Sequence, residues 1–354
     1  MKANNVQLES SREVAIWLLV GVGMIMIQVL LGGITRLTGS GLSITEWKPI
    51  LGTLPPMNET DWLAAFDQYK QIGQFKHINF DFTLSDFKFI YFWEWFHRVW
   101  ARLIGLVFIF PFIYFIWKKK INREMVIPMI ILFLLGSLQG ALGWIMVKSG
   151  LNEEDISVSH IRLAIHFMAA LGLLSYTLWF AFGLIIPETA RIYSPALKRN
   201  TIFLLSLLVL QLVFGAFMAG LKAGSFAPTW PTINGQWWPV VPAKTESGFF
   251  LSDNPIVVQF IHRGLAYLIS FLIFVWYLKT RKMTRFTVFN KNSVLPFVLV
   301  LIQVILGIFT VIYSDNRRSL LWLGVSHQFV AMLLLMSLVL MTYLVGGQKT
   351  AGVE

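Results

Sequence analysis

Long apolar runs follow one another along the chain, separated by short polar or aromatic-rich segments. A helix needs about 20 mostly apolar residues to cross the hydrocarbon core of a bilayer. Eight runs meet this requirement, and each predicts one transmembrane helix. They cover residues 14–34, 88–116, 127–148, 162–186, 200–221, 255–278, 294–314 and 321–345. The pattern therefore predicts an all-α, polytopic membrane protein with eight spans.

The composition supports this class and excludes several others. Only 13% of the 354 residues are charged, against roughly 25% in soluble domains. The absence of cysteine excludes a disulfide scaffold, thiolate metal sites and a cysteine nucleophile. The net charge of +11 does not indicate nucleic-acid binding, because basic residues of membrane proteins usually mark cytoplasmic loops.

Lysine and arginine are distributed unevenly between the two sets of loops. The two termini and the loops near 117–126, 187–199 and 279–293 together hold 15 Lys+Arg against 5 Asp+Glu. Acidic residues prevail in the opposite set. The positive-inside rule therefore predicts that both termini are cytoplasmic.

The second half of the chain repeats the first. A shift of 183 residues aligns the first span and its outer loop with the fifth, and slightly shorter shifts align the later spans. The aligned pairs include Gln28/Gln211, Gly32/Gly215, His97/His262, Arg98/Arg263, Gln139/Gln303, Gly143/Gly307 and His166/His327. Because four spans is an even number, the halves should share one topology, related by a pseudo-two-fold along the membrane normal. We predict two tandem four-helix bundles, residues 1–190 and 191–354.

Four of the six histidines lie one in each even-numbered span, at similar depth below the outer boundary: His97, His166, His262 and His327. Ionisable groups inside a span are costly and by default indicate function. With no cysteine and few carboxylates nearby, histidine pairs across a bundle are typical of heme ligation. The pattern predicts one pocket in each half, whereas histidines hydrogen-bonded between helices are the structural alternative.

Other residues near these positions leave two interpretations open. Each odd-numbered span carries Gln-x-x-x-Gly, whose glycine either packs helices closely or lets a flat macrocycle approach the backbone. Arg98 and Arg263 either pair with heme propionates or extend toward the interface. His77 is expected to be solvated, and His160 to face a different side of its helix from His166.

The two halves differ at one carboxylate. Glu94 lies three residues before His97, on the same helix face, whereas its counterpart before His262 is Gln259. A carboxylate in a span is suited to proton transfer, and an ion pair with Arg98 is compatible with that role. The first half is therefore predicted to hold the reactive pocket and the second half a fixed cofactor.

These residues resemble the heme A synthase family. The resemblance rests on the segments GGITRLTGSGLSITEWKPILGTLPP, EWFHR, VSHIRLAIH, QFIHR and VSHQ, and it covers nearly the whole chain. It implies an enzyme that oxidises the ring-position-8 methyl of heme O to the formyl of heme A. The implied route is two successive hydroxylations through heme I, and the product supplies aa3-type cytochrome oxidase.

The resemblance also implies roles and partners. By position, His262 and His327 match the ligands of a bound heme b, His97 and His166 surround the substrate heme, and Glu94 matches the carboxylate needed for turnover. The missing cysteine pairs of the outer loops fit the cysteine-free, proteobacterial-type branch and a bacterial inner membrane. Heme O synthase (protoheme farnesyltransferase) is the expected donor of heme O, beside an electron donor that the motifs do not specify.

Two other functions are compatible with parts of this pattern. A diheme b-type electron-transfer protein explains the four histidines but not the difference between Glu94 and Gln259. A transporter built from parallel repeats would place its polar groups near the bilayer midplane, whereas here they gather toward the outer face.

Overall fold

The computed structural model describes residues 2–46, 53–239, 250–282 and 287–347. Within these residues, 8 helices are long and apolar enough to cross a membrane. They are α1 (Lys2–Leu37), α4 (Leu84–Trp117), α5 (Arg123–Lys148), α6 (His160–Ile185), α7 (Pro195–Gly220), α9 (Pro255–Thr280), α11 (Val294–Ile312) and α12 (Arg317–Leu344). The described part of the chain forms no β-strand beyond isolated bridges. The predicted all-α, multi-pass membrane protein is confirmed.

Short helices occupy the connections between the spans. They are α2 (Glu59–Tyr69), α3 (Gly73–His77), α8 (Phe250–Asp253) and α10 (Val288–Asn292), with 3-10 turns η2 (Glu188–Ala190) and η3 (Ala223–Phe226). Residues 47–52, which belong to the first segment behind the family resemblance, lie outside the described residues.

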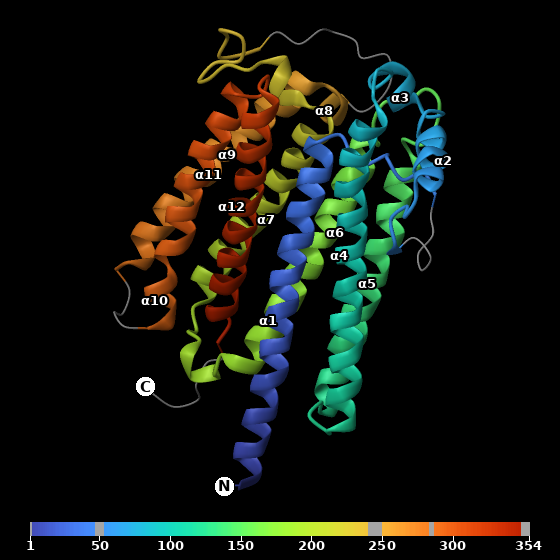
Figure 1. Cartoon of the computed structure of the whole chain (residues 1–354). Helices are drawn as coiled ribbons and strands as arrows, with labels where there is room; N and C mark the ends of the chain where they lie inside the picture. Colours follow the sequence, from blue (N-terminus) through green and yellow to red (C-terminus); the bar gives the residue numbers. More distant parts are fainter. Residues whose placement is uncertain (1, 47–52, 240–249, 283–286, 348–354) are drawn as a thin grey trace.

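The long helices run side by side, and α1 begins at the same end of the bundle at which α12 ends (Figure 1). The short helices α2, α3 and α8 gather at the opposite end (Figure 1). An even number of membrane-spanning helices places the N-terminus and the C-terminus of the chain at the same end of the bundle. The sidedness of the membrane, with cytoplasmic termini, remains a prediction.

The helices that pack together in the first half correspond to those that pack in the second. α1 packs against α4 and α6, and α5 against α6; in the second half α7 packs against α9 and α12, and α11 against α12. The pseudo-two-fold and the boundary at residue 190 remain predictions. The largest hydrophobic cluster contains residues of both halves, including Val22, Leu171, Leu208 and Met332, so the halves share a core.

A cap of aromatic residues covers the first half at the end of the bundle opposite the two termini, which is called the outer end below in accordance with the predicted orientation. Phe66 and Tyr69 of α2 pack against Phe87 at the start of α4, with ring centroids 5.0 and 5.3 Å away. Gly73 of α3 donates its backbone N–H to the carbonyl oxygen of Asn152 at 2.7 Å. A Cβ at Gly73 would lie 2.7 Å from two carbonyl oxygens of the next outer loop, so glycine is required for this close approach. The cap therefore connects the first two outer loops.

Candidate functional site

One cavity of about 1290 Å³ is lined by all four span histidines. The sequence predicts a separate pocket in each half, but the structure joins the two regions into one continuous space. Pockets for small molecules usually measure about 300–1,000 Å³. The cavity is therefore large enough for a ligand of unusual size, or for more than one ligand.

Each glycine of the Gln-x-x-x-Gly motifs faces a histidine on a neighbouring helix. A Cβ on the glycine would lie 3.0–3.3 Å from the histidine Cε1 in every case. The pairs are Gly32 with His97, Gly143 with His166, Gly215 with His262 and Gly307 with His327. The structure adds a third role to the two interpretations that the sequence leaves open, because the missing side chain makes room for an imidazole.

The glutamines of the same motifs contact the histidines in three of the four places. Nε2 of Gln28 lies 3.2 Å from Nε2 of His97, and Nε2 of Gln303 lies 3.2 Å from Nε2 of His327. Nε2 of Gln211 lies 3.4 Å from Nε2 of His262. Gln139, the fourth, lines the cavity. Each motif therefore supplies the glycine that admits the ring, and three of them also supply an amide that orients it.

Several polar atoms around the cavity are buried without a hydrogen-bond partner among the described residues. They include Nδ1 of His166, His262 and His327 and Oε1 of Gln28, Gln211 and Gln303. Buried polar atoms in folded proteins are nearly always satisfied, so such a cluster indicates a missing ligand or water.

The geometry of His262 and His327 fits a metal carried by a macrocycle. Their ring centroids are 6.5 Å apart. A metal–imidazole bond measures about 2 Å, and the ring nitrogen lies about 1 Å from the centroid, so a metal held between two rings separates the centroids by roughly 6 Å. No group of three or more His, Cys, Asp or Glu in the described residues is placed to hold a bare metal ion. Two protein ligands suffice when a porphyrin supplies the other four.

His97 and His166 form the corresponding pair of the first half. They line the same cavity as His262 and His327. Gly32 and Gly143 face these rings as Gly215 and Gly307 face theirs, so both halves present the same contact between glycine and histidine.

The carboxylate of Glu94 is buried at the wall of this cavity, with 3% of its surface exposed. Its Oε1 accepts a hydrogen bond from Arg98 at 2.6 Å. Its Oε2 accepts one from the Ser43 hydroxyl at 2.7 Å and one from the Ile44 backbone N–H at 2.9 Å. The predicted ion pair with Arg98 is confirmed, and the outer loop after α1 supplies two further donors that hold the carboxylate in place.

The second half uses the equivalent loop differently. Ala227 lies 183 residues after Ile44 and accepts a hydrogen bond from Nε2 of Gln259 at 3.1 Å. Arg263 donates to the same carbonyl at 3.3 Å, just as Arg98 donates to the carbonyl of Ile44 at 3.0 Å. Both arginines thus hold an outer loop against a helix, and a role toward propionates remains a prediction for them.

The cavity is strongly positive. Among the described residues that line it, Glu94 is the one carboxylate, whereas seven are cationic: Arg36, Arg98, Arg102, Lys222, Arg263, Arg317 and Arg318. A low-dielectric space lined by charges of one sign attracts ligands of the opposite sign. A ligand that carries several carboxylates, such as a heme with its two propionates, matches this distribution.

The first half leaves open space that the second half fills. Gly136 and Gly140 of α5 line the cavity, and a Cβ on either would meet nothing within 4 Å. The 164-residue shift places them on Val300 and Val304 of α11, and Val300 is buried. α11 packs against α9, whereas α5 and α4 are not among the main packing pairs. The first pocket is therefore the more accessible of the two.

The remaining two histidines lie elsewhere. His77 is exposed on α3, as predicted. Nε2 of His160 lies 2.9 Å from Oδ1 of Asp253 on α8, so this residue connects the outer ends of the two halves. It does not line the cavity.

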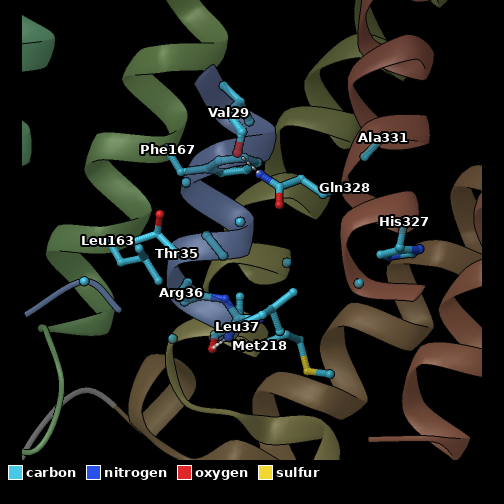
Figure 2. Close-up of a pocket in the computed structure, with 18 of the residues that line it drawn as sticks. Val29, Thr35, Arg36, Leu37, Leu163, Phe167, Met218, His327, Gln328 and Ala331 are labelled. Atoms are coloured by element: carbon cyan, nitrogen blue, oxygen red, sulfur yellow. Dashed lines mark hydrogen bonds between the residues drawn. The ribbon is translucent and has the colours of Figure 1, made fainter. Parts of the chain in front are cut away.

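The sequence did not single out two polar residues at the junction of the halves. Arg36 of α1 donates to the carbonyl oxygen of Ala219 on α7. Gln328 of α12 donates to the carbonyl oxygen of Val29 on α1 at 2.9 Å, beside Phe167 (Figure 2). The repeat offers a signal for the first, because Arg36 and Ala219 are 183 residues apart and therefore occupy equivalent positions.

Comparison with known proteins shows the family of the chain. Proteins named heme A synthase match the chain in Flavobacterium psychrophilum, with 44% identity over 93% of this chain and 96% of the relative. Others match in Flavobacterium johnsoniae, with 41% identity over 95% and 97%, and in Rhodopseudomonas palustris, with 42% identity over 92% and 86%. The family model of COX15-CtaA, cytochrome oxidase assembly protein, matches residues 15–339. This chain therefore belongs to the COX15-CtaA family of cytochrome oxidase assembly proteins.

Proposed function

We propose that the chain is a heme A synthase. It oxidises the ring-position-8 methyl of heme O to the formyl of heme A by two hydroxylations, through the hydroxymethyl compound heme I, with loss of water after the second. The names of the relatives and the family membership support an enzyme of heme A biosynthesis. The residues of the cavity support the assignment of roles within it.

One observation carries the proposal. Glu94 lies on α4 three residues before His97, both line the cavity, and the equivalent position of the second half holds Gln259. An electron carrier with two permanent hemes has no need of a carboxylate in one half. A half that performs chemistry needs one, because hydroxylation of a methyl group develops charge at the carbon and requires protons to be moved.

The more open first pocket supports its assignment to the substrate. Heme O must enter and heme A must leave, and the space beside Gly136 and Gly140 permits exchange. His97 and His166 would hold the substrate heme, so that its reacting methyl lies within the reach of Glu94. Arg98, Ser43 and the backbone of Ile44 keep that carboxylate in a fixed position.

His262 and His327 would hold heme b as the resident cofactor. Their separation and the valines that close their half support a permanent group. Heme b supplies one-electron transfer when bound. Gln211 and Gln303 orient the two imidazoles, and such second contacts adjust the properties of a metal ligand.

The location and partners follow from this function. We assign the chain to a bacterial inner membrane with both termini on the cytoplasmic side, in accordance with the distribution of lysine and arginine. Heme O synthase, the protoheme farnesyltransferase, would deliver the substrate, and an electron donor would serve the resident heme.

The test is a heme inventory of the purified protein. The chain is expressed in a host that makes heme O, and reduced-minus-oxidised spectra are recorded before the hemes are extracted and separated. We expect about one heme b per chain with smaller amounts of heme O, I or A, and loss of heme b in His327→Ala but not in His77→Ala. Two b hemes and no modified heme would instead support the diheme electron carrier, and no heme at all would contradict both.

A further inference from the structure

Arg36 is a charged side chain without a charged partner at the junction of the two pockets. Its guanidinium lines the cavity and donates to the carbonyl oxygen of Ala219 in the last turn of α7. In the described part of the chain it forms no ion pair. A guanidinium carries five N–H donors, so one carbonyl leaves most of them available.

Two other arginines of the chain, Arg191 and Arg98, have both a carboxylate partner and several further contacts. Arg191 pairs with Glu188, donates to the carbonyl oxygens of Tyr343 and Gly346, and stacks on the Tyr343 ring. Arg98 pairs with Glu94 and donates to two carbonyls of the outer loop. Among the described residues Arg36 has neither a carboxylate nor a stacking ring as a partner, although it lines the cavity.

The duplication does not account for Arg36 either. Its equivalent in the second half is Ala219, the residue whose carbonyl it contacts. The contact therefore joins two equivalent positions of the repeat, and only the position in the first half carries a charge. A structural tie between α1 and α7 needs a single donor, whereas Arg36 is half-buried, and a cation withdrawn from water in this way is stabilised when an anion pairs with it.

We infer that Arg36 binds a carboxylate of a tetrapyrrole held in the cavity, from the junction between its two histidine pairs. This inference rests on the proposed function. The carboxylate belongs either to the tetrapyrrole of the first pocket or to that of the second, and Arg36 faces the space that both share. Figure 2 shows Arg36, Met218 and His327 among the residues that line this pocket.

The test compares a ligand that has carboxylates with one that lacks them. Wild-type protein and Arg36→Met are titrated in detergent with protoheme and with protoheme dimethyl ester, while the Soret band is recorded. Charge-assisted hydrogen bonds contribute enough that Arg36→Met should weaken protoheme binding about ten- to hundredfold. Binding of the dimethyl ester should be the same in both proteins, and Arg36→Lys should bind protoheme with intermediate affinity.

Two measurements identify the pocket whose tetrapyrrole supplies the carboxylate. Heme b that co-purifies with the chain reports the second pocket, and titratable binding that disappears in His97→Ala reports the first. If Arg36→Met lowers only one of these two quantities, the carboxylate belongs to the tetrapyrrole in the corresponding pocket. Arg162→Met is the matched control, because Arg162 donates to the single carbonyl of Ile145 and lies outside the cavity.

Two results would overturn the inference. Equal weakening of protoheme and of its dimethyl ester by Arg36→Met would show a structural role for the guanidinium. Unchanged affinity for both ligands, with unchanged co-purified heme b, would show that no carboxylate reaches it. Failure of the wild-type chain to bind any heme would be a different result, since it would contradict the proposed function itself.

Discussion

Arg98 donates to Glu94 at 2.6 Å and to the carbonyl oxygen of Ile44 at 3.0 Å, whereas the equivalent Arg263 donates at 3.3 Å to the carbonyl oxygen of Ala227, which it shares with Gln259. The same arginine thus holds the same loop in both halves. In the first half the carboxylate of Glu94 also accepts hydrogen bonds from this arginine and from the loop, and the second half has a glutamine at that position. The scaffold of the duplicated site is kept, and one copy carries an additional carboxylate.

Replacement of this carboxylate should separate chemistry from binding. Glu94→Gln keeps the size of the side chain and its place beside Arg98, but it removes the negative charge. We expect heme b content to stay near that of the wild type and formation of heme A to fall by about 10²–10⁴-fold, the usual contribution of a group that transfers protons. Extracted hemes are quantified by chromatography.

The control for this variant is Glu153→Gln, which removes an exposed carboxylate paired with Lys76 on the outer surface. It should retain full activity. Loss of bound heme from Glu94→Gln would contradict the catalytic role, because it would show that the carboxylate mainly supports the fold.

The glycines that face the histidines should tolerate no side chain. In Gly307→Ala the new Cβ would lie 3.0 Å from Cε1 of His327, so the imidazole must shift by a few tenths of an ångström. We expect a lower content of heme b and a displaced Soret maximum. Absorption spectra of the purified variant, normalised to protein, provide the measurement.

Gly264→Ala is the matched change on α9, where a Cβ meets nothing within 4 Å. It should leave the spectrum unchanged and, because alanine favours a helix by roughly 0.5–1 kcal/mol over glycine, should not lower the melting temperature. Identical spectra of the wild type and Gly307→Ala would mean that His327 does not ligate the cofactor in this orientation.

Closing the open side of the first half should exclude the substrate. Gly136→Val and Gly140→Val introduce the residues that the second half carries at Val300 and Val304. We expect binding of added heme O to weaken at least tenfold while co-purified heme b is unaffected, because the valines fill space in one pocket only. Equilibrium titration with heme O measures the change, and unaltered affinity in the double variant would show that the substrate does not occupy this space.

The aromatic cap predicts a pH dependence of stability. Burial raises the pKa of the Tyr69 phenol to about 12, an effect to which the nearby Glu94 carboxylate contributes and which a hydrogen bond from Asn79 opposes. Since the phenol ionises at lower pH in the unfolded chain, near 10, its contribution to stability is present below that pH and is lost as the pH rises toward 12.

Melting temperatures measured by circular dichroism between pH 9 and 12 check this prediction. The decrease over that range should be smaller in Tyr69→Phe than in the wild type, whereas Tyr313→Phe, which changes an exposed tyrosine, should behave as the wild type. Equal decreases in the melting temperatures of the wild type and Tyr69→Phe would contradict the burial of the phenol.

Relationships that depend on residue type and on repeated positions were the ones that the sequence could predict. The four histidines and Glu94 were identified because an ionisable residue inside a long apolar run is conspicuous, and their pairing followed from the duplication. The role of the motif glycines was left open, since Gly32 and His97 are far apart in the chain and their contact depends on how α1 and α4 rotate against each other. Arg36 was missed for the same reason.

The sequence by itself determined the eight spans, the repeated residue pattern and the difference between Glu94 and Gln259, because these depend on the length of apolar runs and on the identity of residues at repeated positions. The tertiary structure decided that each motif glycine faces a histidine, that the two pockets form one cavity, and that Arg36 lies at their junction. Helix packing sets these distances, and packing depends on side-chain contacts between segments that the linear order of residues does not bring together.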